Sequence, residues 1–356
     1  MMDSLGNRIP KNAIILRHTE VPDFRNCRLP WVVASHNGMN LEPLVSNEKL
    51  RFGTCWHGGL EAYYRRLLQG NEPSDYTEIM KQGFMEEYDK QLNKIQLNLG
   101  AAYGDPELLE KLKAEKELGM ALSESYIDWV IDNPPEDLEI SDKDLQVLAV
   151  EWRIVVPLYN PFNQRKSKIY IAAKLDTVVA HGERLLVLEH KTASKATDVN
   201  NNPLLQLDLQ MGIQLYVLRE FLRKVKHPTP LQKIMQSKKL SGAIYNVTRK
   251  QAPSSKVKNP LHGRQRVLRS NLELDNLGRE LFLDGGRMRN CIKHPSTEIY
   301  TNPEPYAGSK CSWKCAIKSI CEARNRGEDY QFLLNQKFKP RDKDIWQLLE
   351  EETKES

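Results

Sequence analysis

The sequence lacks long apolar runs, and this absence limits where the protein can act. No stretch approaches the roughly 18 consecutive apolar residues that a membrane-spanning helix needs. The opening segment, MMDSLGNRIPKNAIILRH, contains no apolar run followed by the small-residue cleavage site that marks a secretory signal. We therefore expect a cytoplasmic protein that has no membrane partner.

The sequence also lacks internal repeats, low-complexity tracts and a strong charge of either sign. Its 356 residues carry a net charge of +5, with 40% hydrophobic and 28% charged residues. These proportions exclude wholesale disorder and allow a sizeable core. The mild basic excess permits a nucleic-acid partner without requiring one.

Cysteine is scarce, since the chain contains six. In a reducing compartment these thiols are not expected to form disulfides. Three of them nevertheless fall within one short stretch near the end of the chain, KCSWKCAIKSICEAR, and this grouping needs its own explanation.

The order of expected elements predicts an α/β protein built around a mixed sheet. The first fifty residues read as irregular. Apolar stripes at helical spacing predict helices at 56–69, 78–95 and 105–131. Short segments rich in β-branched residues predict an antiparallel meander at 148–159, 168–180 and 184–192, and a further strand at 240–250.

Residues 203–225 between these strands alternate at first like a strand, but their length and later apolar stripe favour a helix. The stretch from 254 to 270 is polar and basic, and we expect a loop there. Helices, then a strand meander, a helix and a strand are the order expected of helices packed on a mixed sheet.

One expected hairpin, KLDTVVAHGERLLVLEHKTAS, carries charges in an apolar setting. Glu189 and Lys191 are two positions apart, so in a strand both side chains point to one face, and a turn would bring Asp176 beside them. Carboxylates can hold the Mg²⁺ or Mn²⁺ ions that assist phosphodiester hydrolysis, and a lysine can assist the attacking water. Taken alone, the same residues could also be an ordinary exposed strand end. Lys174, Glu183 and Arg184 read as flanking charges.

The segment KLDTVV…LLVLEHKTAS resembles the PD-(D/E)XK nuclease superfamily, in particular its RecB-like exonuclease branch, which includes phage-encoded, AddB-type and CRISPR-adaptation nucleases. Asp176, Glu189 and Lys191 match the core motif, while Leu175 replaces the usual proline. The resemblance implies a restriction-endonuclease-like core, a mixed central sheet flanked by helices. It also implies that Asp176, Glu189 and the backbone carbonyl of His190 bind the metal.

Three further motifs extend the resemblance over residues 20–325. The helix FGTCWHGGLEAYY matches one whose histidine is a metal ligand, which corresponds to His57. Glu151 matches an acidic residue before the first core strand. The family's Q-x-x-x-Y helix is matched imperfectly, with Gln210 as the catalytic candidate and Gln214 and Tyr216 as accessory candidates. Each of these residues could instead be an ordinary surface or structural side chain.

The cysteines complete the resemblance. Cys311, Cys315 and Cys321 follow a C-x3-C-x5-C spacing, and thiolates suit an iron–sulfur cluster or zinc. Relatives with a [4Fe-4S] cluster take a fourth ligand from near the N-terminus, which corresponds to Cys27, with Cys55 and Cys291 as alternatives. The spacing departs from the usual C-x2-C-x5-C, and the thiols could also be metal-free.

These assignments divide the chain into four parts. Residues 1–50 form an N-terminal segment with Cys27, and residues 51–135 form a helical region with His57. Residues 140–250 form the nuclease core. Residues 251–356 form a C-terminal part with the basic loop, the cysteines and a charged tail.

The basic stretch after the core suits DNA phosphates, because it contains seven positive and no negative side chains. The candidates are Arg249, Lys250, Arg264 and Arg266, followed by Lys256, Lys258 and Arg269, with Arg65 and Arg66 as weaker ones. A solvated loop would have the same composition. No base-reading motif is present, so sequence specificity is not expected.

The resulting hypothesis is a Mg²⁺- or Mn²⁺-dependent DNA exonuclease acting on single- or double-stranded ends. It would serve recombination, repair or phage DNA metabolism, in the host cytoplasm if phage-encoded, possibly beside a helicase or recombination partner. An endonuclease or nickase on the same core is the alternative enzyme. A non-catalytic DNA-binding protein with an iron–sulfur or zinc centre is the alternative outside enzymes.

Overall fold

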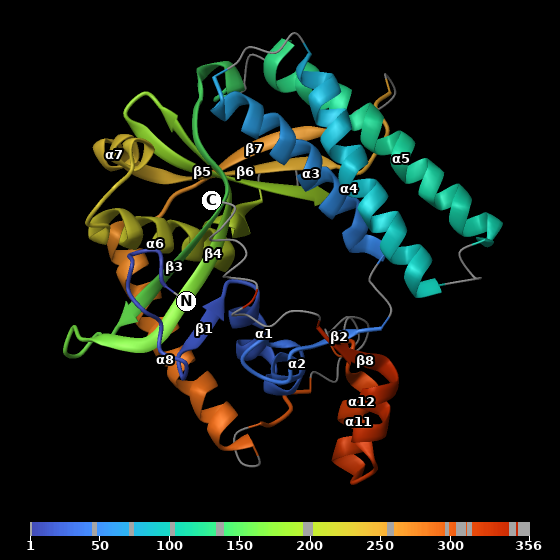
Figure 1. Ribbon diagram of the computed structural model, residues 1–356, viewed down its shortest axis with the longest axis vertical. Coiled ribbons are helices and arrows are strands. Elements are labelled where there is room, and N and C mark those ends of the chain that lie inside the picture. The colour runs from blue at the N-terminus through green and yellow to red at the C-terminus, as the bar shows by residue number, and fades with distance from the viewer. Residues whose placement is uncertain are drawn as a thin grey trace.

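The computed structural model describes residues 2–44, 48–70, 75–99, 104–132, 139–194, 202–254, 260–295, 299–303, 311, 315–341 and 347. A six-stranded mixed sheet forms its centre, with helices packed on both faces (Figure 1). The expected α/β class, a mixed central sheet flanked by helices, is therefore confirmed.

The sheet has the strand order β1-β4-β5-β6-β7, and β3 pairs with the remaining edge of β4. Its strands are β1 (Ile14–Arg17), β3 (Gln146–Tyr159), β4 (Lys166–His181), β5 (Arg184–Ala193), β6 (Lys239–Arg249) and β7 (His262–Val267). The expected meander is confirmed, since β3, β4 and β5 pair antiparallel. β6 lies parallel to β5, and β1 lies parallel to β4.

Two sequence expectations about irregular segments were wrong. The first fifty residues contain β1, α1 (Glu20–Asn26), α2 (Arg28–Ala34) and β2 (Leu41–Pro43). Part of the polar stretch after β6 is a strand, because β7 completes the sheet edge beside β6. β1 and β2 are short and pair with strands far away in the chain, β4 and β8. β7 pairs with the preceding strand β6, but its polar sequence lacks the apolar alternation that predicts a strand.

The long helices confirm the expected helical region. They are α3 (Glu48–Leu68), α4 (Tyr76–Leu99) and α5 (Pro106–Ile127). Asp105 caps α5 by accepting the backbone N–H of Glu107, and Pro106 occupies the first turn, as the Asp-Pro pair predicts. The helix expected at 203–225 is a short 3-10 turn, Pro203–Leu207, followed by α6 (Leu209–Lys224), which Asp208 caps.

The remaining elements are α7 (Pro230–Ser237), α8 (Asn271–Lys293), α11 (Lys318–Arg326), α12 (Tyr330–Lys337) and β8 (Phe338–Pro340). β8 pairs antiparallel with β2, which joins the C-terminal helices to the N-terminal segment. The two ends of the described chain are thereby brought together across the fold.

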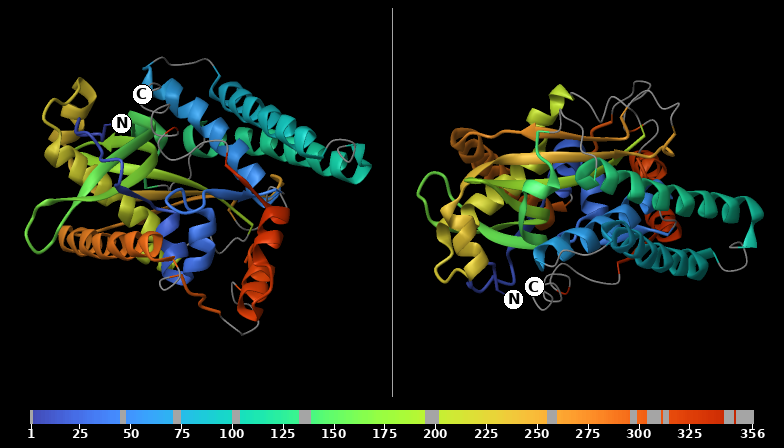
Figure 2. Two further views of the ribbon diagram at one scale, coloured as in Figure 1. Left: turned by 60° about the horizontal axis from the view of Figure 1, so that its bottom comes forward. Right: turned by 90° about the horizontal axis from the view of Figure 1, so that it is seen from above.

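The sheet separates two hydrophobic cores. On one face, α6 and α8 pack on inward residues such as Leu175, Val178 and Val187. On the other face, α3, α4 and α5 bury an aromatic cluster against Val179 and Leu188. Figure 2 shows α4 and α5 as a long pair that projects beyond the sheet. In the described part of the chain, none of the helices combines the length and apolarity needed to cross a bilayer.

Candidate active site

The site lies where one edge of β4 has no partner strand. β1 pairs with that edge as far as Ala172, and β5 pairs with it only from Thr177 onward. β3 occupies the opposite edge. Residues 173–176 therefore face a gap where β1 and β5 both end. Asp176 and Glu189 are the first residues beyond the last β4–β5 pair, so the opening of the sheet itself places the two acids.

Asp176 is 9% exposed and needs a positive partner. Its Oδ2 accepts the backbone N–H of His190 at 2.9 Å and lies 3.6 Å from Nδ1 of His57. Burial raises the pKa of Asp176 well above its usual value, and the nearby Glu189 charge raises it further. Such a carboxyl favours a bound cation, because a cation stabilises its ionised form.

Glu189 is held by three donors on the α6 side of the gap. Lys191 Nζ and Gln210 Nε2 both contact its Oε1, and Gln214 Nε2 donates to Oε2 at 2.6 Å. Lys191 Nζ also donates to Gln210 Oε1 at 3.1 Å. Burial lowers the pKa of Lys191, but the Glu189 carboxylate more than offsets this, so the net pKa is raised and the ammonium is kept charged.

Glu151 joins His57 and Asp176 in a group of three candidate metal ligands. Ligand atoms of His57, Glu151 and Asp176 all lie within 4.8 Å of one another, and within the described ranges no other histidine, cysteine or acidic residues form such a group. Glu151 has a backbone φ of 54°, a left-handed conformation that is uncommon for a residue with a side chain. One imidazole nitrogen and two carboxylate oxygens are donors that fit Mn²⁺ or Mg²⁺.

His57 is in the right state to be a ligand. Burial lowers its pKa to about 4, with the Glu189 charge opposing this change, so the ring is neutral near pH 7. A neutral imidazole has a lone pair available for a metal. The carboxylate of Glu151 also forms an ion pair with Lys174 Nζ.

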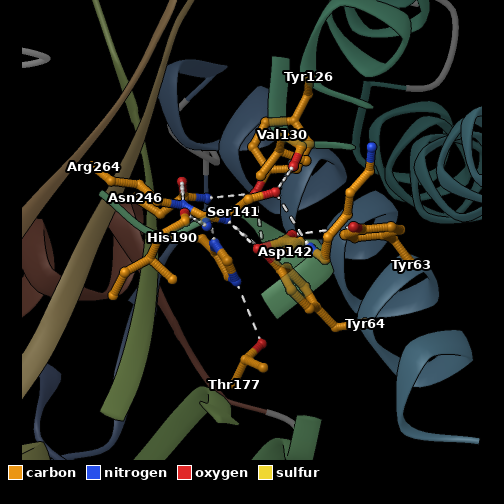
Figure 3. A network of polar contacts seen from close by, with 12 residues as sticks. Tyr63, Tyr64, Tyr126, Val130, Ser141, Asp142, Thr177, His190, Asn246 and Arg264 are labelled. Carbon is orange, nitrogen blue, oxygen red and sulfur yellow. Dashed lines mark hydrogen bonds and ion pairs between the residues drawn. The ribbon is translucent and has the colours of Figure 1, made fainter. Parts of the chain in front are cut away.

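The ring of His190 lies in a buried polar network (Figure 3), with its centroid 6.3 Å from that of the His57 ring. Tyr64 stacks on it with ring centroids 5.1 Å apart, and Asn246 Nδ2 donates to its Nδ1 at 2.9 Å. Since Nδ1 accepts, Nε2 carries the proton and faces Thr177 Oγ1 at 3.4 Å. The ring therefore fixes the His190 backbone, whose N–H contacts Asp176, and the ring nitrogens are occupied by protein partners.

Arg264 anchors the same network, which corrects one sequence expectation. Its guanidinium pairs with Asp142 at 2.6 Å and donates to Ile140 O, Asn246 Oδ1 and the hydroxyl of Tyr64. The side chain is 5% exposed. A cation buried among these acceptors cannot reach a DNA phosphate, so the expected DNA contact at Arg264 was wrong.

The other basic candidates are distributed around β6 and β7. Arg266 pairs with Glu139 at 2.8 Å, Arg249 is buried, and Lys250 lies over the ring of Phe52 at 5.4 Å. The candidates Lys256 and Lys258 lie outside the described residues. Among the residues that the structure describes, Arg249, Lys250, Arg264 and Arg266 therefore do not form the exposed basic loop that the composition suggested.

Tyr216 is placed away from the two acids. It lines a different cavity, of about 1120 Å³, together with Arg219 and Glu220. Gln214, by contrast, is fully buried and contacts Glu189 directly. Of the accessory candidates on α6, the structure brings Gln214 to the site and leaves Tyr216 outside it.

In the portion of the chain that the structure describes, the four cysteines of the expected cluster are linked only by weak electrostatic influence on one another. The thiol of Cys321 has its pKa raised by burial and then by the charges of Cys27, Cys315 and Cys311. Within the described residues, no three of these sulfur atoms lie within 4.8 Å of each other. Cys55 and Cys291 are fully buried in the two separate cores.

Two residues near the site were missed by the sequence reasoning. His18 follows β1 directly, and burial lowers its pKa to about 4 against the opposing charge of Glu189, which places it beside the gap. Lys174 was taken as a flanking charge but contacts Glu151. The polar pair Arg17-His18 directly after the apolar run AIIL was a signal for His18, and the two-residue spacing from Asp176 was one for Lys174.

Comparisons with known proteins identify the family of the chain. The model of the PD-(D/E)XK nuclease superfamily matches residues 18–322, which include every site residue described above. A search of curated proteins gave no significant match.

Proposed function

The chain belongs to the PD-(D/E)XK nuclease superfamily, and we propose that it is a metal-dependent DNA exonuclease that hydrolyses phosphodiester bonds. The observation that carries the proposal is the convergence of His57, Glu151 and Asp176 within 4.8 Å beside the Glu189–Lys191 pair. The exonuclease mode rests on the order of motifs that resembles the RecB-like branch.

The residues divide into a metal-binding side and a proton-handling side. His57, Glu151 and Asp176 would hold Mg²⁺ or Mn²⁺, with Glu189 and the carbonyl of His190 as further oxygen donors. A bound ion of this kind polarises the phosphate and generates a nucleophilic water.

Lys191 contributes a positively charged hydrogen-bond donor at the gap in the sheet, which the acidic residues cannot provide. Its ammonium would orient the attacking water and stabilise negative charge on the phosphate. Gln210 contacts both Lys191 and Glu189, so it keeps the ammonium aimed into the gap rather than into solvent.

The decisive experiment is a digestion of end-labelled DNA. Single- and double-stranded substrates, linear and circular, are incubated with Mn²⁺ or Mg²⁺. The exonuclease proposal expects linear DNA to be degraded from its ends and circular DNA to survive. Cleavage of the circles would instead establish the endonuclease or nickase alternative.

Lys191→Ala tests the chemistry, with the exposed Lys239→Ala as its matched control. We expect Lys191→Ala to lower activity at least about a hundredfold while circular dichroism still shows the native fold. A wild-type protein that degrades no DNA with either ion would overturn the proposal. In that case the non-catalytic DNA-binding alternative would remain. The biological setting that we propose is intracellular DNA recombination, repair or phage DNA metabolism.

A second proposal concerns the cysteines. Cys27 is brought from the N-terminal segment to within electrostatic reach of Cys315 and Cys321. Four thiols from the two ends of a chain suit a [4Fe-4S] cluster, and zinc is the alternative. An anaerobic preparation should contain iron and sulfide and show charge-transfer absorbance. Cys315→Ser should lose both signals and the control Cys55→Ala should keep them, whereas a colourless, iron-free wild type contradicts the cluster.

A further inference from the structure

Lys174 lies at the candidate metal site, although it is neither one of the acidic ligands nor the catalytic lysine. It is two residues before Asp176 on β4, so both side chains point to the same face of the strand. Its Nζ forms an ion pair with Oε2 of Glu151. The Glu151 side chain is 10% exposed and that of Lys174 is 44% exposed, so the carboxylate is fixed while the ammonium borders solvent.

The ammonium also borders a hollow that opens from the site. A cavity of about 460 Å³ lies between α3, the edge strand β3 and α7, and its lining includes Glu151, Trp152, Arg153 and Lys174, with Arg65 on the α3 side. Lys174 faces Arg153 in the β3–β4 register. Lys174, Arg153 and Arg65 therefore line the hollow that begins at Glu151, with Arg65 paired to Glu61, which lines it too.

Glu151 cannot serve two cations equally. A divalent ion at the group of three ligands gains two carboxylates and one imidazole, whereas the ammonium carries a single charge on a flexible stem. A bound ion would therefore take Glu151, and Lys174 would lose its partner. A half-exposed ammonium beside a bound metal then favours an anion, and the backbone of DNA provides phosphates in a regular row.

We propose that Lys174 exchanges the Glu151 carboxylate for a DNA phosphate when the metal binds, and so couples metal binding to substrate binding. The inference rests on the proposed nuclease function and adds to it a phosphate contact in the hollow beside β3. Before the metal binds, Lys174 neutralises Glu151. After it binds, Lys174 holds the substrate strand next to the gap.

The first arm of the test measures metal binding without DNA. Mn²⁺ affinity is measured by titration calorimetry for the wild type, Lys174→Gln and the control Lys168→Gln, an exposed lysine on the same strand. Removing the competing ammonium should tighten Mn²⁺ binding by about tenfold, and Lys168→Gln should leave it unchanged. Unchanged or weaker Mn²⁺ binding by Lys174→Gln would overturn the exchange.

The second arm measures DNA binding by the fluorescence anisotropy of an end-labelled duplex. A Lys191→Ala background prevents degradation. With Mn²⁺, Lys174→Gln should weaken DNA binding about fivefold, consistent with one lost phosphate contact, and without metal it should have no effect. Equal weakening in both conditions would mean an ordinary surface contact and would overturn the coupling.

The two arms separate this inference from the proposed function. A wild type that degrades no DNA removes the nuclease proposal, but the second arm can still be measured, because it records DNA binding and not turnover. The calorimetric arm still decides whether Lys174 and the metal compete for Glu151, because it requires neither DNA nor turnover.

Discussion

Glu151 on β3 faces Asp176 on β4 between two regular backbone pairs, Val150–Thr177 and Trp152–Leu175. The flanking pairs hold a glutamate whose φ is 54°, a conformation that costs about 1–2 kcal/mol for an L residue. Strain of this kind persists only where the surrounding structure imposes it, and it is concentrated at functional sites. Here it accompanies the convergence of the Glu151 carboxylate with Asp176 and His57.

Glu151→Asn should separate function from stability. Asparagine tolerates the left-handed conformation, so the free energy of unfolding without metal should stay within about 1 kcal/mol of the wild type. Loss of a ligand should weaken Mn²⁺ binding and DNA cleavage at least about tenfold. Calorimetry, urea unfolding and the end-labelled assay measure the three quantities. Glu183→Asn, at an exposed turn, is the control, and full activity of Glu151→Asn would exclude Glu151 from the site.

Gln210 and Tyr216 on α6 should respond in opposite ways. Gln210 contacts both Glu189 and Lys191, so Gln210→Ala should lower kcat about tenfold or more by releasing the lysine. Tyr216 lines a separate cavity, and Tyr216→Phe should keep activity within about twofold of the wild type. If Tyr216→Phe were the damaging change, the placement of α6 relative to the acids would have to be revised.

The sequence predicted the parts of the site that lie close together along the chain. Asp176, Glu189 and Lys191 share a hairpin, and two-residue spacing fixed the common face of the last two. Gln210 came from the resemblance of the next helix to the family's Q-x-x-x-Y helix. What the sequence could not indicate was the break in strand pairing at Thr177, because that break depends on β1, which pairs with β4 from more than 150 residues away.

The prediction of DNA contacts from the basic residues near β7 failed at Arg264 for a related reason. The pattern of arginines and lysines near β7 suggested an exposed loop, but charge alone does not reveal whether an acid such as Asp142 is buried nearby. Tyr63 and Tyr64, from α3, donate to the same carboxylate, so the partners of Arg264 come from distant segments. Composition alone predicts a phosphate contact both for an exposed arginine and for one that is buried in an ion pair.

Arg264→Met should therefore act on stability. It leaves Asp142 buried without its cation, which should lower the free energy of unfolding by about 3–5 kcal/mol. If that variant does not fold, Arg264→Lys is the alternative, since lysine keeps the charge but cannot reach all the acceptors. The salt dependence of DNA binding should be unchanged in whichever variant folds. A reduced salt slope with unchanged stability would instead restore Arg264 as a phosphate contact.

His262 should make stability depend on pH. Burial between Ser125 and Thr248, with Tyr126 and Trp129 against the ring, lowers its pKa to about 3. The unfolded chain, with an ordinary histidine pKa near 6.5, therefore binds a proton first as the pH falls. The stability that the neutral ring contributes is fully present above about pH 6.5 and is lost progressively as the pH falls toward 3.

His262→Gln keeps a hydrogen-bonding side chain but removes this titration. Urea unfolding of the two proteins at pH 7 and pH 5 should show the wild type losing about 2 kcal/mol more than the variant over that interval. His227→Gln, which replaces an exposed histidine at the rim of another cavity, is the control and should follow the wild type. Parallel curves for the wild type and His262→Gln would mean that the ring of His262 reaches water in the folded state.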